Sequence, residues 1–174
     1  MLGFILIALL LQISGDVELN PGPPFLDCMY VNARSLKNKL NEFKILIATH
    51  MPDIVFVTES WSNESVYDHE FLSNDYSVTR KDRGTRGGGV LVAFRNELTC
   101  IRRNDVELSE SIENEIMVVD IKVAASKVTC LLCYRPPNAG HNFISNLISV
   151  LDNCVGHGLQ NLYMVGDFNL PNIN

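Results

Sequence analysis

Hydrophobic residues in this sequence form short continuous runs in some places and helix-like repeats in others. The runs, each four to eight residues long, are typical of buried strands and lie at 26–31, 53–58, 76–79, 90–94, 116–123, 128–134 and 162–165. Two further segments space their apolar residues three or four positions apart, which predicts helices that bury one face. Those residues are Leu36, Leu40, Phe43 and Ile47, and then Phe143, Leu147, Val150, Leu151 and Cys154. Ser35 stands at the N-cap position of the first helix.

The order of these elements predicts a mixed α and β fold. Several predicted strands follow one another without a helix between them, as at 116–123 and 128–134. Such an order is less regular than that of a doubly wound parallel sheet. We therefore expect an α/β fold of two packed mixed β-sheets flanked by helices.

Composition and charge narrow the functional classes. The chain has 174 residues, of which 47% are hydrophobic and 20% charged, as expected for one folded domain rather than a disordered chain. The 14 Lys and Arg against 20 Asp and Glu give a net charge of −6. This balance excludes a protein that binds nucleic acid through overall positive charge. It leaves room for a nucleic-acid enzyme with a local basic strip.

The five cysteines do not form a disulfide framework, because their number is odd and their spacing wide. Cys130 and Cys133 make a CxxC motif, but it lies inside the predicted strand 128–134 and no second CxxC completes a four-ligand zinc site. Small core residues on a strand are the favoured interpretation.

The first residues carry features of processing signals. The apolar run 2–11 is too short to span a bilayer. Its length suits the apolar part of a secretory signal peptide, although no Lys or Arg precedes it. The sequence thus predicts no stable membrane span and leaves a secretory route open.

Residues 16–23 read Asp-Val-Glu-Leu-Asn-Pro-Gly-Pro. This segment resembles the 2A-type ribosome-skipping peptide, Asp-Val/Ile-Glu-x-Asn-Pro-Gly-Pro, at all seven specified positions. The resemblance implies that the ribosome does not form the Gly22–Pro23 bond. Residues 1–22 would then be a separate processing segment, and 23–174 the folded domain. A plain turn explains Asn-Pro-Gly-Pro but not Asp16, Val17 and Glu18 before it.

Polar residues gather at the ends of the predicted strands. Asn32, Glu59, Tyr134, Asp167 and Asn169 each lie at or just past such an end, where functional sites of layered α/β folds collect. Any one of them alone is more typical of a turn, a cap or a buried aromatic. Carboxylate and amide oxygens together indicate a divalent-cation site.

Five motifs in order give these residues a family context. The chain resembles the endonuclease/exonuclease/phosphatase superfamily, specifically the endonuclease domain of non-LTR (LINE-type) retrotransposons, over roughly residues 26–174. The resemblance implies a four-layer, deoxyribonuclease-like α/β sandwich. The motifs are Tyr30-Val31-Asn32-Ala33-Arg34-Ser35-Leu36, Val57-Thr58-Glu59-Ser60-Trp61, Gly87-Gly88-Gly89-Val90, Tyr134-Arg135-Pro136-Pro137-Asn138 and Gly166-Asp167-Phe168-Asn169.

The resemblance also implies a role for each residue in phosphodiester hydrolysis. Glu59 would be the main ligand of Mg²⁺, or of Mn²⁺, with Asn32 beside it holding metal and phosphate. Asp167 would orient the attacking water. Asn169 would donate a hydrogen bond to the transition state, and Tyr134 would bind the phosphate.

The one basic cluster spans residues 80–86 and leads into the triple glycine. The resemblance implies that Lys81, Arg83 and Arg86 contact DNA phosphates. A solvated hairpin loop explains the same charges.

Two departures from the family matter. Arg34 stands where the abasic-site repair branch has an acidic metal ligand, which disfavours that activity. The family's Ser-Asp-His motif is also absent, and losing a positioned general base costs on the order of 10²–10⁴ in rate. We therefore expect 23–174 to be the N-terminal two-thirds of the domain, with its second sheet incomplete and its activity impaired.

Two alternatives stay open. One is a catalytically dead, truncated remnant; the other is a lipid or inositol phosphate phosphodiesterase of the same superfamily. The expected partners of the intact element are a DNA substrate and a reverse transcriptase domain, which place it in the nucleus or cytoplasm. The sequence carries no signal for an oligomeric state.

Overall fold

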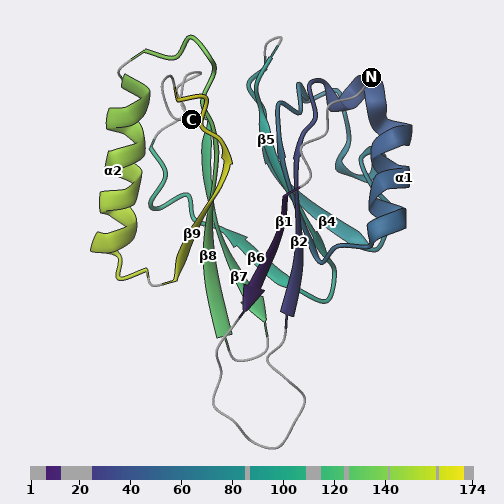
Figure 1. The fold of residues 1–174 in the computed structure, drawn as a ribbon, viewed down its shortest axis with the longest axis horizontal. Helices are drawn as coiled ribbons and strands as arrows, with labels where there is room; N and C mark the ends of the chain where they lie inside the picture. The colour runs from purple at the N-terminus through teal and green to yellow at the C-terminus, as the bar shows by residue number, and fades with distance from the viewer. Residues whose placement is uncertain are drawn as a thin grey trace, which may run out of the picture.

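Two β-sheets face each other, and one helix covers the outer side of each (Figure 1). The computed structural model describes residues 7–12, 25–84, 87–108, 115–123, 126–140, 142–159 and 161–170. The first sheet has the order β1-β2-β3-β5-β4 and the second β6-β7-β8-β9. The strands of the first are β1 (Ile7–Gln12), β2 (Phe25–Asn32), β3 (Ile54–Thr58), β4 (Tyr76–Lys81) and β5 (Val90–Arg95). Those of the second are β6 (Thr99–Arg102), β7 (Ile116–Val123), β8 (Ser126–Tyr134) and β9 (Leu162–Asp167).

Each sheet contains one parallel pair, and these two pairs decide where the strand ends meet. β2 runs parallel to β3, so that Asn32 lies opposite Thr58 at their last register position. β8 runs parallel to β9, with Tyr134 opposite Asp167 at the same point. The other pairs are antiparallel. The carboxyl ends of four strands are thus brought to one edge of the sandwich.

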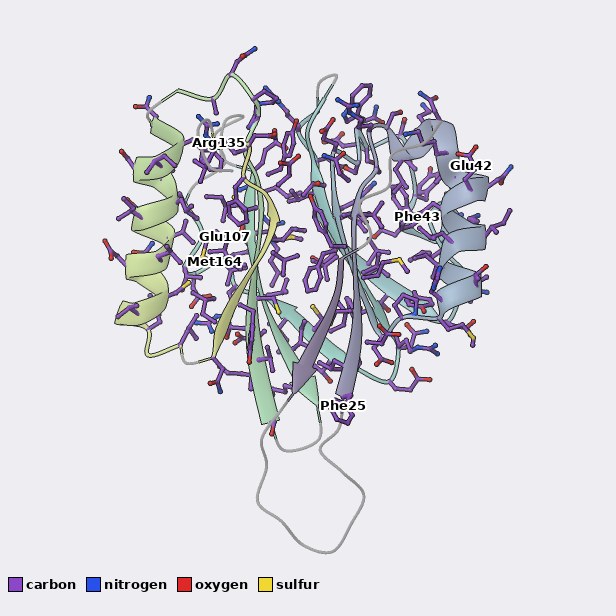
Figure 2. The ribbon with its side chains drawn as sticks, viewed as in Figure 1. Phe25, Glu42, Phe43, Glu107, Arg135 and Met164 are labelled. Atoms are coloured by element: carbon purple, nitrogen blue, oxygen red, sulfur yellow. The ribbon has the colours of Figure 1, made fainter. Side chains whose placement is uncertain are left out.

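The helices pack through the apolar stripes that the spacing predicts. A 3-10 turn, η1 (Leu36–Lys39), leads into α1 (Leu40–His50), which buries Phe43 and Ile47 against the first sheet. α2 (Asn142–Gly156) buries Phe143, Val150 and Cys154 on the second. Figure 2 shows Phe43 on the side of α1 that faces the strands. No helix in the described ranges could span a membrane.

Apolar side chains fill the space between the sheets. β3 is buried along its whole length, because one of its faces packs against β7 and β8 of the second sheet and the other packs under α1. This is the two-layer arrangement that strands with continuous apolar runs require. The prediction of two mixed sheets flanked by helices is confirmed.

The structure adds elements that the hydrophobic pattern did not predict. β6 is a short edge strand of alternating exposure, and four residues give too little periodicity to detect. β1 pairs with β2 from within the predicted processing segment 1–22. A further 3-10 turn, η2, spans Asp68–Glu70. The predicted boundary at Gly22 and Pro23 lies outside the described residues.

Ser35 precedes the first helical turn as predicted, but it does not cap it through its side chain. Its backbone is left-handed, with φ 77°. Its amide instead donates to the carbonyl oxygen of Glu59 at 3.0 Å. The reason is tertiary, because the segment after β2 is bound to the segment after β3 rather than shaped by a local cap.

The cysteines are free thiols, and four of the five are buried, as the core interpretation requires. Burial raises the pKa of Cys28 and Cys133 from 9.0 to about 12. The folded state therefore keeps these thiols neutral at pH values where the unfolded chain ionises them. We expect the free energy of unfolding to fall as the pH rises from 9 toward 12, measured by urea unfolding at fixed pH steps. Cys28→Ala should reduce that slope, and an unchanged slope would contradict this account.

Candidate active site

Three of the predicted site residues, far apart in sequence, meet at the edge where the strands end. The side-chain amide of Asn32 donates from Nδ2 to Glu59 Oε1 at 2.9 Å and to Asp167 Oδ2 at 3.0 Å. All three side chains are half-buried. One amide thus links two carboxylates, one from each sheet.

Strand pairing puts them there. Asn32 ends β2, Asp167 ends β9, and Glu59 follows the last residue of β3. The amide of Ala33 continues the pairing by donating to the carbonyl of Thr58 at 2.9 Å. Because the carboxyl ends of parallel strands lie at one edge, the side chains that follow them converge.

Glu59 has a left-handed backbone, with φ 52°, and Trp61 has φ 51°. Non-glycine residues adopt this region only where the surroundings impose it. Here the next two amides are held by the triple glycine: Ser60 N–H donates to Gly89 O at 3.1 Å, and Trp61 N–H donates to Gly88 O at 2.9 Å. These contacts turn the chain sharply after β3.

Two phenols border the carboxylates. Burial, followed by the nearby carboxylates of Glu59 and Glu115, raises the pKa of Tyr134 well above its ordinary value. Burial also raises the pKa of Tyr30 to about 12, and its hydroxyl lies 2.8 Å from that of Thr58. Both phenols are therefore protonated at neutral pH and able to donate hydrogen bonds.

Asn169 is held by a different partner from the other predicted site residues. Its Nδ2 donates to the carbonyl oxygen of Arg135 at 2.8 Å, and Arg135 Nη1 donates back to the carbonyl oxygen of Asn169 at 2.5 Å. Asn169 is exposed and Arg135 is buried. The amide is thus engaged at the turn after β9.

Two basic residues of 80–86, Lys81 and Arg83, are engaged with buried carboxylates. Arg83 Nη1 donates to Glu115 Oε1 at 3.1 Å. Lys81 Nζ lies 3.9 Å from Glu107 and donates to the carbonyl oxygen of Ile116 at 3.4 Å. Arg86 lies outside the described residues. The solvated-loop interpretation is therefore too simple for Lys81 and Arg83.

The oxygen atoms of this edge fit a hard divalent cation. Asn32 Oδ1 is buried and has no hydrogen-bond partner. The Nδ2 atom of the same amide contacts the two carboxylates. A buried acceptor without a partner costs free energy, and a cation would satisfy it. Within the described ranges no group of three or more His, Cys, Asp and Glu is placed to bind a metal. One or two carboxylates with an amide and waters suit Mg²⁺, which retains much of its hydration.

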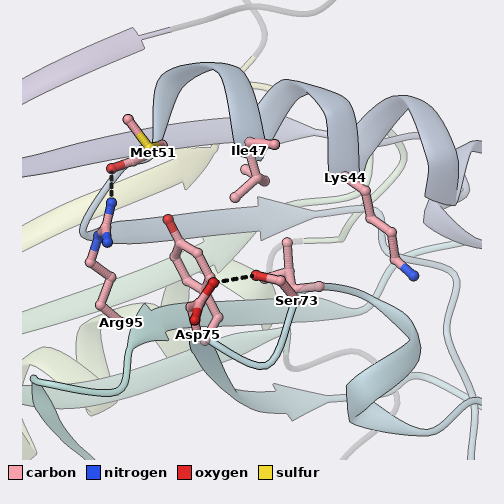
Figure 3. Close-up of a pocket in the computed structure, with 9 residues that line it drawn as sticks. Lys44, Ile47, Met51, Ser73, Asp75 and Arg95 are labelled. Carbon is pink, nitrogen blue, oxygen red and sulfur yellow. Dashed lines mark hydrogen bonds between the residues drawn. The ribbon is translucent and has the colours of Figure 1, made fainter.

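A pocket of about 420 Å³ lies at the opposite end of the first sheet (Figure 3). α1, residues of the segment 72–76 and Arg95 at the end of β5 line it, and Arg95 donates to the carbonyl oxygen of Met51 at 2.7 Å there. It contains none of the predicted site residues. The convergence of polar groups, rather than this cavity, identifies the site.

Glu115 and Tyr30 border the site but were not predicted as site residues. Tyr30 shares a strand face with Asn32, two residues on, which could have indicated it. Glu115 precedes β7, and nothing in its local sequence distinguishes it. Its partners Arg83 and Gly89 are 32 and 26 residues away.

Comparison with solved structures gives the same fold. The endonuclease domain of TRAS1, a telomere-specific non-LTR retrotransposon, matches with a TM-score of 0.59 and 19% identity, over 82% of this chain and 58% of that one. The AP endonuclease LMAP from Leishmania major matches with a TM-score of 0.62 and 14% identity, over 82% and 55%. The 3′ phosphatase NExo from Neisseria matches with a TM-score of 0.61 and 14% identity, over 86% and 60%. This chain thus spans between 55% and 60% of those structures.

Comparison of the sequence with protein families identifies the family, which the similar structures alone do not. No curated protein matches the chain. The model of the endonuclease/exonuclease/phosphatase family, however, matches residues 29–172, which include every strand from β3 to β9 and all five motifs. With most of its length matched and the two-sheet sandwich in place, the chain belongs to the endonuclease/exonuclease/phosphatase family.

Proposed function

We propose that this chain is part of a Mg²⁺-dependent endonuclease domain that nicks DNA for a non-LTR retrotransposon. The observation that carries the proposal is the Asn32–Glu59–Asp167 cluster, with its unpartnered amide oxygen. Enzymes of the family generally depend on a divalent metal. The TRAS1 endonuclease domain is the similar structure that favours the retrotransposon branch.

Glu59 and Asn32 would hold the metal, Mg²⁺ or Mn²⁺. The bound ion would neutralise charge on the scissile phosphate and its leaving oxygen. The backbone at Glu59 supports this role, because a strained residue held by two neighbouring turns is fixed before the ligand arrives. The hydrogen bonds from Asn32 fix the two carboxylates relative to each other in the same way.

Asp167 would orient and polarise the attacking water. Tyr134 would donate a hydrogen bond to a phosphate oxygen, which the raised pKa of its phenol supports. Asn169 would donate to the transition state after exchanging its bond to Arg135. Since no Ser-Asp-His motif occurs among the 174 residues, we propose that this chain by itself is a weak enzyme.

Lys81, Arg83 and Arg86 would contact DNA phosphates beside the site. Arg83 supports this best, because its side chain remains 26% exposed while it pairs with Glu115. In the intact element a reverse transcriptase domain would extend the nicked strand. The endonuclease would then act in the nucleus.

A phosphatase or phosphodiesterase of the same superfamily is the second candidate. The observation in its favour is the similarity to the 3′ phosphatase NExo, at the same TM-score range as the endonucleases. A catalytically dead remnant is the third. The cluster of Asn32, Glu59 and Asp167 favours a working metal site over it.

The test is a Mg²⁺ titration of the full chain, followed by the fluorescence of Trp61, the only tryptophan, and by nicking of supercoiled plasmid. We expect a saturable fluorescence change and slow nicking that EDTA abolishes. Metal binding with cleavage of a phosphorylated lipid or nucleotide, and none of plasmid, would favour the second candidate. Metal binding without turnover of any of these would support the remnant. No metal response would overturn the proposal.

We also propose that residues 16–23 make the ribosome omit the Gly22–Pro23 bond, on the strength of the seven matching positions. Translation in vitro with reporters on both sides should then yield two separate products. Replacing Pro23 with alanine should convert them to one fused product, because alanine is a better nucleophile on the ribosome. A single product from the unaltered sequence would contradict this proposal.

A further inference from the structure

Glu115 is a buried carboxylate just outside the cluster, with its side chain 5% exposed. Its Oε2 accepts the N–H of Gly89 at 2.6 Å, and its Oε1 accepts Arg83 Nη1 at 3.1 Å. A buried carboxylate is tolerated only with partners of this kind. The neighbouring Gly88 has φ +68°, and a Cβ there would lie 2.2 Å from Glu115 Oε1. The carboxylate therefore fits closely against the glycine turn.

That turn is the one that holds the Glu59 segment. The carbonyl oxygens of Gly88 and Gly89 accept the amides of Trp61 and Ser60, the two residues after Glu59. A short path of hydrogen bonds thus runs from Glu115 through Gly89 to the turn that bears the metal-binding carboxylate. Ser60 also fills the space at Gly89, where a Cβ would lie 2.5 Å from its Oγ.

The main chain of Glu115 belongs to the second sheet, because Glu115 directly precedes β7. Its carbonyl oxygen accepts the amide N–H of Tyr134 at 2.9 Å. Glu115 is thus bound directly to β8, the strand that carries the Tyr134 phenol. Burial raises the pKa of the Glu115 carboxyl above its ordinary value, and the Gly89 amide and the nearby Arg83 oppose that rise.

We propose that Glu115 is a positioning residue: it clamps the Gly88–Gly89 turn and thereby sets Glu59 relative to Tyr134. This inference rests on the proposed role of Glu59 as metal ligand. It assigns Gly88 a function in the site, since only a residue without a side chain leaves room there for the Glu115 carboxylate. It also assigns Arg83 a second task beside any contact with phosphate.

The test compares Glu115 with Glu107, which is the matched control. The Glu107 side chain is also 5% exposed and accepts a backbone amide, Val118 N–H at 2.9 Å, and an arginine, Arg102 Nη2 at 2.7 Å. We expect Glu115→Ala to speed hydrogen exchange of the Ser60 and Trp61 amides about tenfold more than Glu107→Ala does. It should also raise the Mg²⁺ concentration of half-saturation about tenfold, as loss of a supporting partner does at metal sites.

Glu115→Gln keeps an acceptor for the Gly89 amide. It should therefore keep the exchange rates of the Ser60 and Trp61 amides and the Mg²⁺ concentration of half-saturation close to those of the unaltered chain. Equal effects of the Glu115 and Glu107 variants on the Ser60 and Trp61 amides would overturn the proposal. If the unaltered chain shows no response to Mg²⁺, the proposed function fails, while the exchange rates still decide the role of Glu115.

A glycine pair gives a second route if Glu115→Ala does not fold. Gly88 and Gly84 both have left-handed backbones, φ +68° and +71°, but a Cβ at Gly84 would meet nothing within 4 Å. We expect Gly88→Ala to speed exchange of the Ser60 and Trp61 amides at least tenfold, and Gly84→Ala to leave it unchanged. Protected amides in Gly88→Ala would count against the clamp.

Discussion

Replacing Glu59 with glutamine is expected to weaken Mg²⁺ binding by about two orders of magnitude and to reduce plasmid nicking to background. The substitution keeps the size of the side chain and an oxygen for Asn32, but it removes one of the two carboxylates beside the unpartnered amide oxygen. Mg²⁺ binds through one or two carboxylates and loses its waters reluctantly, so one lost charge removes much of the affinity. Trp61 fluorescence during a Mg²⁺ titration measures it.

Glu42→Gln is the control for that experiment, because Glu42 is an exposed acid on α1, the helix that covers the outer side of the first sheet (Figure 2). It should bind Mg²⁺ like the unaltered chain. An equal loss in both variants would mean that overall charge attracts the ion. Unchanged affinity in Glu59→Gln would remove Glu59 from the metal site and leave Asp167 as the main candidate.

Phe43→Ala is expected to lower the free energy of unfolding by about 3–5 kcal/mol, the usual cost of deleting a buried aromatic ring. Phe43 is 1% exposed and joins α1 to the outer face of the first sheet. Its loss leaves a cavity under the helix that the rigid sheet cannot close. Urea unfolding, monitored by circular dichroism, gives the value.

Phe25→Ala provides the matched comparison, since Phe25 is the same residue type but 57% exposed at the start of β2 (Figure 2). We expect a change within about 0.5 kcal/mol. Similar losses for both phenylalanines would contradict the packing of α1. If Phe43→Ala lowered the free energy of unfolding by no more than Phe25→Ala is expected to do, α1 would not pack on the sheet through Phe43.

The elements themselves could be predicted because their causes are local. Continuous apolar runs gave β3 and β7, and a three-and-four spacing gave α1 and α2. Where local periodicity was short, as in the four residues of β6, the element was missed. Ser35 shows the same limit, because its backbone follows a bond to Glu59 rather than a helix cap.

In the candidate site, too, the residues in local motifs could be predicted from sequence, and the contacts between distant segments could not. Asn32, Glu59 and Asp167 could be named from sequence, since each follows a strand and occurs in a family motif. Asn169 was named with them, yet its amide binds Arg135. Glu115 was not named, because its partners lie in another sheet and no local pattern records them.

The sequence by itself determined the order of strands and helices, the absence of a disulfide framework and the family motifs. The strands, the helices and each single motif depend on residues within a few positions of one another, and the disulfide argument needs only the number and spacing of the cysteines. Only the tertiary structure decided that one amide joins two carboxylates 27 and 135 residues away from it. It also decided that Lys81 and Arg83 pair with buried acids, and that Glu115 holds the glycine turn. The physical reason is that strand register and sheet packing set these contacts, and both are properties of the whole fold.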